Sequence, residues 1–188
     1  RIPELMTGKT FDQTVRARDF SAAPVVLQVD DLSRSGQFED ISLVVRRGGT
    51  VGITGLLGAG RTELALALFG MLRPHSGQVT LEGKPVQFGS NRDAIAAGIA
   101  YLSEDRLSIG LIQPQSIADN LVITSLGKIM SGGLLTDRLK RELVAGWVAD
   151  LGIRIGRQSD AISTLSGGNQ QRIAIAKWDG SHPELLIL

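Results

Sequence analysis

Three glycines separate a β-branched run from a helix-forming stretch, at a spacing suited to phosphate binding. The β-branched run is Val51 to Thr54, the glycines are Gly55, Gly58 and Gly60, and Thr62–Phe69 follows, rich in leucine and alanine. Leucine and alanine favour helices, so the expected order is strand, loop and helix. Glycines let the backbone approach a ligand closely, and a helix N-terminus favours an anion. The sequence therefore predicts a phosphate-binding loop here.

The loop matches the P-loop pattern G-x-x-x-x-G-K-[ST] in all but one position. Arg61 stands where the pattern has lysine. Its guanidinium keeps the positive charge but is a planar fork, so it is not expected to reach the β- and γ-phosphates in the same way as a compact ammonium. Thr62 is expected to offer its hydroxyl to Mg²⁺. The residues expected to bind nucleotide are Gly55, Leu56, Leu57, Gly58, Ala59, Gly60, Arg61 and Thr62.

Two other interpretations of these glycines remain open at this point. The loop could receive the pyrophosphate of a dinucleotide, as in a nicotinamide-dependent oxidoreductase, if an acidic residue about 20 positions on holds the ribose. Glu82 is the nearest candidate, and it comes late. Alternatively, the glycines form a turn between a core strand and a core helix and bind no ligand.

The composition is that of an ordinary globular protein and excludes several kinds of site. Hydrophobic residues make up 43% and charged residues 21% of the 188, which suits one domain with a sizeable core. A formal net charge of +1 gives no electrostatic reason to expect nucleic acid as a partner. The absence of cysteine excludes disulfides and Cys-based metal sites. Arg1 is not a start and Glu184–Leu188 reads as a buried strand, so the chain is interpreted as a fragment.

Strand signals dominate the first half of the chain and helical signals the second. Residues 1 to 23 show no sustained period and suggest a linker. Helical signals extend from Glu104 to about Leu165. The predicted strands include Val25–Val29, Ile41–Val45, Gln78–Leu81, Pro85–Phe88 and Ile99–Leu102. One apolar helix face is predicted from Leu139, Leu143, Trp147 and Leu151, which recur every four residues.

A second glycine motif, LSGGNQQ, begins at Leu165. Ser166 is a good N-cap, so a helix is expected from Gly167 to about Trp178. Two glycines at a helix start cost stability, which is understandable if the backbone must approach a ligand closely. The alternative is a capped surface helix with a flexible first turn.

Together the two motifs resemble those of ABC transporter ATPases, whose signature sequence is similar to LSGGNQQ. Ser76–Val79 and Gly83–Val86 look like the hairpin that follows the P-loop in that family, and Glu184–Leu188 looks like the start of its Walker B strand. Arg61, the Glu104-Asp105-Arg106 run and the intact signature resemble the second, C-terminal half of the tandem ATPases of bacterial carbohydrate importers, the ribose, galactose and xylose class. Related importers of autoinducer-2 or nucleosides remain alternatives.

The resemblance implies an α/β fold with three parts. They are a P-loop NTPase core with a RecA-like parallel sheet, an antiparallel β subdomain and an α-helical subdomain at about residues 104–165. Residues 1–23 would be the linker between the two ATPase halves, and residues 24–188 an ABC nucleotide-binding domain truncated at the Walker B strand.

The resemblance also implies ATP and Mg²⁺ as cofactors and a site shared between two halves. The expected partners are the first ATPase half of the same polypeptide, membrane permease subunits contacted by residues 104 to about 125, and, indirectly, a periplasmic or lipoprotein sugar-binding protein. The location implied is the cytoplasmic face of the bacterial inner membrane, peripherally bound. The residues expected to contact the other half's ATP are Ser166, Gly167, Gly168, Asn169 and Gln170.

Three departures from the family pattern favour, as an alternative, a regulatory half that binds nucleotide without turnover. Arg61 replaces lysine, and Glu104 replaces the glutamine of the Q-loop. No aromatic residue adjoins Ser35 to stack on adenine. Phe38 is the expected substitute. The chain also stops before the Walker B aspartate, the catalytic glutamate and the switch histidine, so no general base is assigned and the isolated chain is expected to be inactive.

Overall fold

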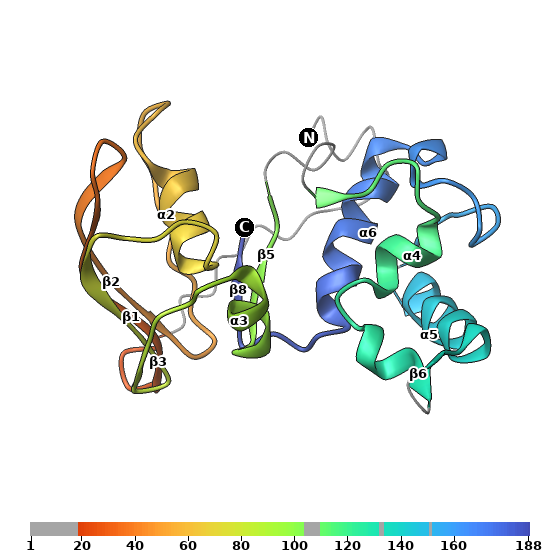
Figure 1. Cartoon of the computed structure of the whole chain (residues 1–188), viewed down its shortest axis with the longest axis horizontal. Helices are drawn as coiled ribbons and strands as arrows, with labels where there is room; N and C mark the ends of the chain where they lie inside the picture. Colours follow the sequence, from red (N-terminus) through yellow and green to blue (C-terminus); the bar gives the residue numbers. More distant parts are fainter. Residues whose placement is uncertain (1–18, 104–109, 132–133, 151) are drawn as a thin grey trace.

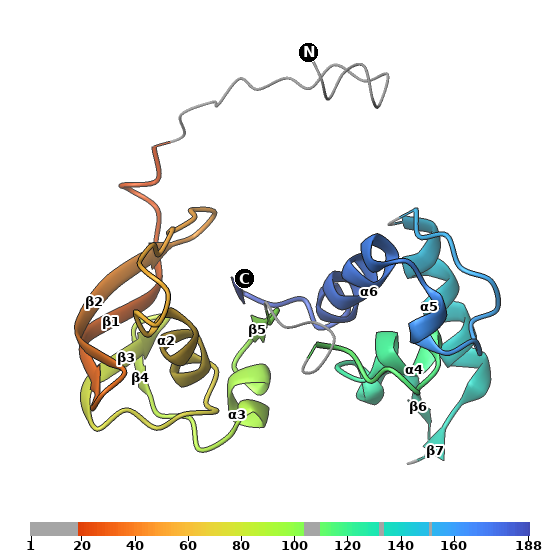
Figure 2. The same cartoon turned by 90° about the horizontal axis from the view of Figure 1, so that it is seen from above.

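The computed structural model describes residues 19–103, 110–131, 134–150 and 152–188. These residues form two lobes on either side of a short pair of strands, β5 and β8 (Figure 1). One lobe holds the sheet of β1 to β4 and helix α2, and the other is mainly helical. Figure 2, turned by 90°, shows the same separation. The prediction of a linker in residues 1–23 falls mostly outside the described residues.

A four-stranded antiparallel sheet in the order β2-β1-β3-β4 forms most of the first lobe. Val26, Leu27, Val29 and Leu32 of β1 are buried in one cluster with Leu64 and Leu68 of the helix α2, Arg61–Leu68. β-branched and aliphatic residues favour a strand where they can pack in this way. The strands are β1 Val25–Arg34, β2 Phe38–Arg46, β3 Ser76–Leu81 and β4 Lys84–Val86, which confirms the predicted strands in this region.

A parallel strand pair joins segments far apart in the sequence. Helix α3, Asn91–Ala96, leads into β5, Ile99–Tyr101, which pairs with β8, Leu185–Ile187. The N–H of Glu184 donates to the carbonyl of Gly98 at 2.8 Å, which fixes the register at the start of the pair. This pair confirms the strands predicted at both places.

The second lobe packs its helices around a separate apolar cluster. Val144 and Trp147 of α5 are buried in it, with Leu139 and Leu143 partly buried beside them, so the predicted helix face is confirmed up to Leu151, which lies outside the described residues. The elements are α4 Ile117–Val122, the 3-10 helix η2 Leu126–Ile129, the hairpin β6 Met130–Ser131 and β7 Leu134–Leu135, α5 Asp137–Asp150, the 3-10 helix η3 Ile162–Thr164 and α6 Gly167–Asp179.

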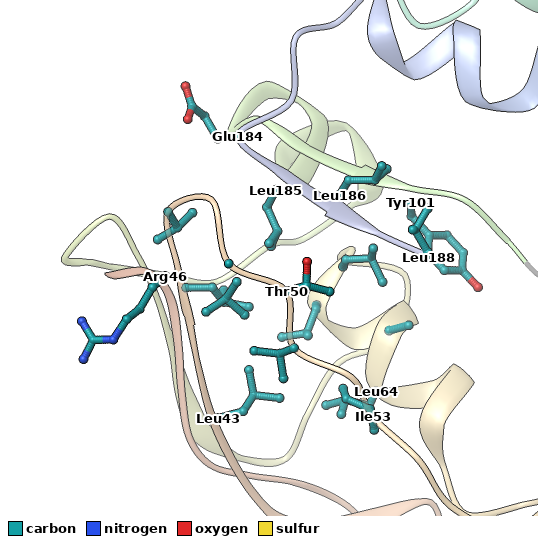
Figure 3. Close-up of a pocket in the computed structure, with 18 of the residues that line it drawn as sticks. Leu43, Arg46, Thr50, Ile53, Leu64, Tyr101, Glu184, Leu185, Leu186 and Leu188 are labelled. Carbon is teal, nitrogen blue, oxygen red and sulfur yellow. The ribbon is translucent and has the colours of Figure 1, made fainter. Parts of the chain in front are cut away.

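The run from Val51 to Thr54 is not a strand, so that prediction is wrong. Its residues are exposed, and no strand of the described parts of the chain pairs with them. A cavity of about 550 Å³ lies between this run and β8, and Figure 3 shows Thr50 and Ile53 on one wall and Leu185 on another. β-branched residues favour a strand only where a neighbouring strand offers backbone partners. The cavity separates this run from β8, so β8 offers it none.

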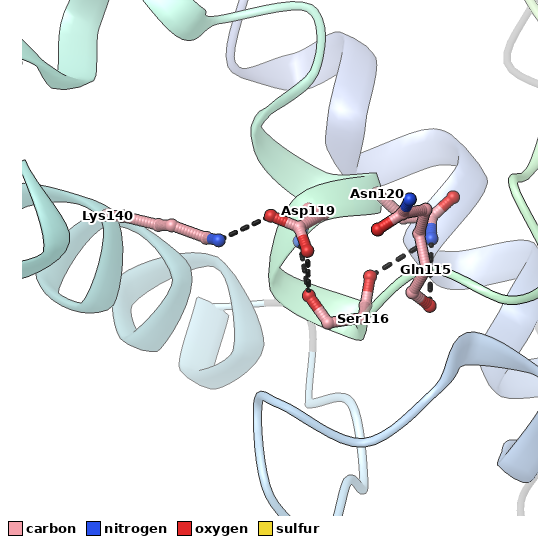
Figure 4. Close-up of polar contacts among 5 residues, drawn as sticks. All are labelled: Gln115, Ser116, Asp119, Asn120 and Lys140. Atoms are coloured by element: carbon pink, nitrogen blue, oxygen red, sulfur yellow. Dashed lines mark hydrogen bonds and ion pairs between the residues drawn. The ribbon is translucent and has the colours of Figure 1, made fainter. Parts of the chain in front are cut away.

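A cluster of polar side chains fastens α4 to its neighbours (Figure 4). The Ser116 hydroxyl oxygen accepts from the N–H of Asp119 at 3.0 Å and donates to Asp119 Oδ2 at 2.5 Å. Lys140 of α5 forms an ion pair with the same carboxylate. Asn120 is only 2% exposed and donates to the carbonyls of Ser116 at 3.0 Å and Ile112 at 3.1 Å. These bonds hold the loop before α4 against the lobe.

Replacing Asp119 by asparagine is expected to lower the stability of the chain at neutral pH but not in acid. The Lys140 ammonium, and then the Ser116 hydroxyl, lower the pKa of Asp119 below its ordinary value of 3.8. A carboxyl whose folded-state pKa is depressed stabilises the fold above its unfolded-state pKa, and this contribution is lost as the pH falls through the folded-state pKa. Because both side chains of the ion pair are partly exposed, the loss is at most about 1 kcal/mol.

Thermal unfolding at about pH 7 and at about pH 2 measures this difference, because the Asp119 carboxylate is increasingly protonated as the pH falls. Glu142→Gln is the matched control, since it removes an exposed i,i+4 ion pair with Arg138 on α5. A loss of stability in Asp119→Asn that is equally large at both pH values would contradict the assignment.

Candidate functional site

The predicted phosphate-binding loop lies on the surface of the first lobe. Residues 51–59 are exposed, whereas Gly60 is buried against the turn between β1 and β2. Gly60 is the N-cap of α2 in a left-handed conformation, φ 77°, and its carbonyl accepts from the N–H of Leu64 at 2.9 Å. The N–H groups of the first helical turn have no partner within a helix, so they are available to an anion.

The side chain of Arg61 lies back across this loop. A Cβ built on Gly55 would lie 3.8 Å from Arg61 Cδ and 4.0 Å from Arg61 Nε. The first and seventh positions of the motif are therefore neighbours in space, and the guanidinium is beside the loop backbone. Thr62 is exposed in the first turn of α2, with its hydroxyl open to a ligand. These residues fit a nucleotide phosphate, with Thr62 as the group that would hold Mg²⁺.

The two leucines of the motif, Leu56 and Leu57, do not point into the fold. They are 85% and 100% exposed, so they contribute backbone rather than side-chain packing to the loop. Phe38, expected to stack on adenine, is only 6% exposed and belongs to the apolar core under Gly60. That expectation is wrong, because a ring buried in the core presents no free face to a base.

The LSGGNQQ segment forms the exposed N-terminus of α6 in the other lobe. Ser166 is the N-cap, as predicted, but its side chain makes no capping hydrogen bond. Ser166, Gly167 and Gly168 are all exposed, and a Cβ built on either glycine would meet no atom within 4 Å. The packing of this chain therefore does not require glycine at these two positions, although glycine weakens a helix by about 1 kcal/mol relative to alanine.

The two polar residues after the glycines turn toward their own lobe. Asn169 Nδ2 donates to the carbonyl of Arg154 at 3.0 Å. Gln170 is 8% exposed, and its Nε2 donates to the carbonyls of Ile162 at 3.2 Å and Leu165 at 3.1 Å. Gln170 thus holds the turn before the helix, while Ser166 and the glycines face outward.

The two motifs do not meet within one chain. The loop before α2 belongs to one lobe and the N-terminus of α6 to the other (Figure 1). Glu104 lies outside the described residues. Among the described residues, no group of three or more His, Asp or Glu side chains could hold a metal ion. None of the helices in the described parts of the chain is long and apolar enough to cross a membrane.

The polar side chains that fasten α6 and the segment around α4 were not predicted from the sequence. Asn120 is buried and closes the loop around Ile112, although the run SIADNL reads as an ordinary helix start. Gln170, Ile173, Ala174 and Lys177 lie at i, i+3, i+4 and i+7, and all are buried. That spacing is the signal that could have shown that Gln170 and Lys177 face inward.

Solved structures share this fold. A dimeric ATP-binding cassette in a post-hydrolysis state, bound to ADP and phosphate, matches with a TM-score of 0.68 at 17% identity, over 85% of this chain and 72% of that one. The protein cbiO1 of Clostridium perfringens, part of an ABC transporter complex, matches with a TM-score of 0.65 at 22% identity, over 87% and 64%. The fold is that of an ATP-binding cassette, built on a P-loop NTPase core.

The sequence comparisons then define the family. The ABC transporter family model matches residues 38–188, and the chain belongs to this family. The ribose import ATP-binding protein RbsA 2 of Streptomyces avermitilis is 41% identical over 183 residues, which are 97% of this chain and 36% of that protein. RbsA 1 of Agrobacterium fabrum is 41% identical over 187 residues, 100% of this chain and 37% of that protein. The chain thus spans little more than a third of the length of these relatives.

Membership of this family removes the dinucleotide-binding alternative. That interpretation needed an acidic residue to hold a ribose, and it left LSGGNQQ without a role. Glu82, its candidate, instead forms an ion pair with Arg47 at 2.5 Å.

Proposed function

We propose that this chain is part of the ATP-binding subunit of an importer for a sugar of the ribose, galactose or xylose class. It would couple ATP binding and hydrolysis to uptake of the sugar through membrane permease subunits. The observation that carries the proposal is the pair of motifs, each exposed on its own lobe, in a chain 41% identical to ribose import ATP-binding proteins. The subunit would be bound peripherally at the cytoplasmic face of the membrane.

We infer further that the chain corresponds to the second half of a tandem ATPase. Arg61 at the lysine position of the P-loop supports this assignment, because it resembles the second halves of such importers. The loop from Gly55 to Thr62 would hold phosphates in this half's own site, with Mg²⁺ at Thr62. Nucleotide binding here without turnover, a regulatory role, is the second candidate, and the replacement of lysine by Arg61 favours it.

The signature would act on ATP held by the first half. Separation of the two motifs into different lobes supports a site completed by another ATPase half (Figure 1). The open space around Gly167 and Gly168 supports close approach of an external group to the helix backbone. Ser166, with no capping bond, keeps its hydroxyl free to donate to a phosphate oxygen.

The segment Gly110–Ser125 is the proposed contact with the permease. Its inner face is buried, with Leu111, Ile117 and Leu121 at most 4% exposed. Ile112 and Ile123 are 45% and 43% exposed on the same segment. Apolar side chains at both ends of the exposed face suit a contact with another protein.

The proposed function is tested by comparing the isolated chain with the complete transporter. We expect the isolated chain to bind MgATP weakly and to release no phosphate above background, because Arg61 replaces the P-loop lysine and the site is proposed to need another ATPase half. The complete ATPase, reconstituted with its permease and sugar-binding protein in vesicles, is expected to take up radiolabelled sugar only when ATP is supplied. Ribose, galactose and xylose are the substrates to compare.

Two results would contradict this proposal. One is ATP binding and hydrolysis by the complete transporter without uptake of any of the three sugars. The other is sustained hydrolysis by the isolated chain that persists through repurification, which would show that the chain needs no other ATPase half.

A further inference from the structure

Helix α6, which begins with the signature, reaches both apolar clusters of the molecule. Ile173, Ala174 and Ala176 are buried in the cluster of the helical lobe. Trp178, near the other end of α6, belongs to the cluster of the first lobe. Its ring meets that of Phe69, next to the last residue of α2, edge-on with centroids 5.9 Å apart. The position of α6 is therefore linked to both lobes.

Lys177 connects this helix to both ends of the segment Gly110–Ser125. Its Nζ donates to the carbonyl of Gly110 at 2.5 Å. Its own backbone carbonyl accepts from the hydroxyl of Thr124. A third connection runs through Ile162. Its N–H donates to the carbonyl of Gln115, and its carbonyl accepts from Gln170 Nε2 on α6. The segment is thus fastened to α6 near its beginning, in its middle and near its end.

Burying this ammonium costs free energy that the fold could have avoided. Lys177 is 9% exposed, and burial lowers its pKa below the ordinary value of 10.5. Among the described residues, no carboxylate forms an ion pair with it, and one carbonyl together with the ring of Trp178, whose centroid is 5.2 Å from Nζ, offsets only part of the desolvation of an ammonium. A methionine of similar length would fill the same space without that cost. Stability alone therefore does not explain a lysine at this position.

We propose that Lys177 is a positioning residue that transmits the contact between Gly110–Ser125 and the permease to the signature at the start of α6. This inference rests on the proposed function of that segment. When the segment moves with the permease, the bond from Nζ to Gly110 makes α6 move with it. Ser166 and Gly168 then change position relative to the ATP of the other half. Without the ammonium, the start of the segment loses its bond to α6, and only the bond from Thr124 and the connection through Ile162 remain.

The test uses the complete transporter in vesicles, with Lys177→Met and Lys177→Arg. Methionine keeps the packing volume and removes the donor, whereas arginine keeps a cationic donor. Lys140→Met is the matched control, because Lys140 lies in the same lobe and binds Asp119 of α4 rather than α6. The measurements are the melting temperature, the ATPase rate and the number of sugar molecules taken up per ATP.

We expect Lys177→Met to keep or raise the melting temperature and to lower uptake per ATP at least about fivefold, the lower range of coupling between sites. Lys177→Arg is expected to restore most of the ratio, and Lys140→Met to leave it unchanged. An unchanged ratio in Lys177→Met overturns the proposal, and so does a lower melting temperature with a normal ratio per folded protein. The latter result would assign Lys177 a structural role only.

Hydrogen exchange separates failure of this inference from failure of the proposed function. In the isolated chain, Lys177→Met is expected to speed amide exchange in residues 110–116, and Lys177→Arg to restore protection. If this exchange does not change, the inferred connection between Lys177 and Gly110 is wrong, whatever result the transporter assay gives. If exchange changes as expected but the wild-type transporter takes up no sugar, the proposed function has failed and with it the coupling role inferred for Lys177.

Discussion

Replacing Gly168 by aspartate is expected to lower ATP hydrolysis by the complete transporter by about 10²–10³-fold. In the proposed pair of ATPase halves, Gly168 faces the γ-phosphate of ATP held by the first half. A carboxylate there adds bulk and a like charge beside a polyanion, which prevents the two halves from closing. Steady-state ATPase activity in vesicles is the measurement. Arg61→Ala in the other site is expected to cost far less, because the replacement of lysine by Arg61 already favours nucleotide binding without turnover there.

The structure separates this loss of activity from a loss of folding. A Cβ on Gly168 meets no atom within 4 Å, and a carboxylate in the first turn of α6 interacts favourably with the helix dipole. The isolated Gly168→Asp chain is therefore expected to unfold at the same temperature as the wild type or higher. An inactive Arg61→Ala transporter beside an active Gly168→Asp transporter would reverse the assignment of the two sites.

Local sequence patterns predicted several of the elements that have a buried face of their own. Short runs rich in β-branched residues predicted β1 and β2, and the four-residue recurrence on α5 predicted a helix whose Val144 and Trp147 are buried. Val51 to Thr54 failed because a strand also requires a neighbour, and propensity says nothing about where β8 will lie. The same limit applies to any element whose partner comes from a distant part of the chain.

The candidate site was predictable to a similar extent. Motif spacing placed Gly55 to Thr62 at the start of α2 and Ser166 at the N-cap of α6, as the structure shows. It did not show that Phe38 is buried or that Gln170 faces inward. The direction of a side chain depends on tertiary packing, whereas a motif fixes only the order of residue types.

The loop before α2 offers a second large and specific effect, on stability. Gly58 and Gly60 both have left-handed backbones, with φ of 79° and 77°. A Cβ on Gly58 would meet no atom within 4 Å, whereas one on Gly60 would lie 2.0 Å from the carbonyl oxygen of Gln37. The two positions therefore share the same backbone strain and differ only in the space around them.

Replacing Gly60 by alanine is expected to lower the free energy of unfolding by about 2–4 kcal/mol, from left-handed strain plus overpacking. The Cβ would push the turn of β1 and β2 away from the N-terminus of α2, so binding of MgATP to this half should weaken as well. Gly58→Ala is the matched control and should cost no more than about 1 kcal/mol, because strain is partly offset by lower entropy of the unfolded chain. Chemical denaturation of the three proteins measures the difference. Equal losses in both variants would show that the contact between Gly60 and Gln37 does not hold the loop against the sheet.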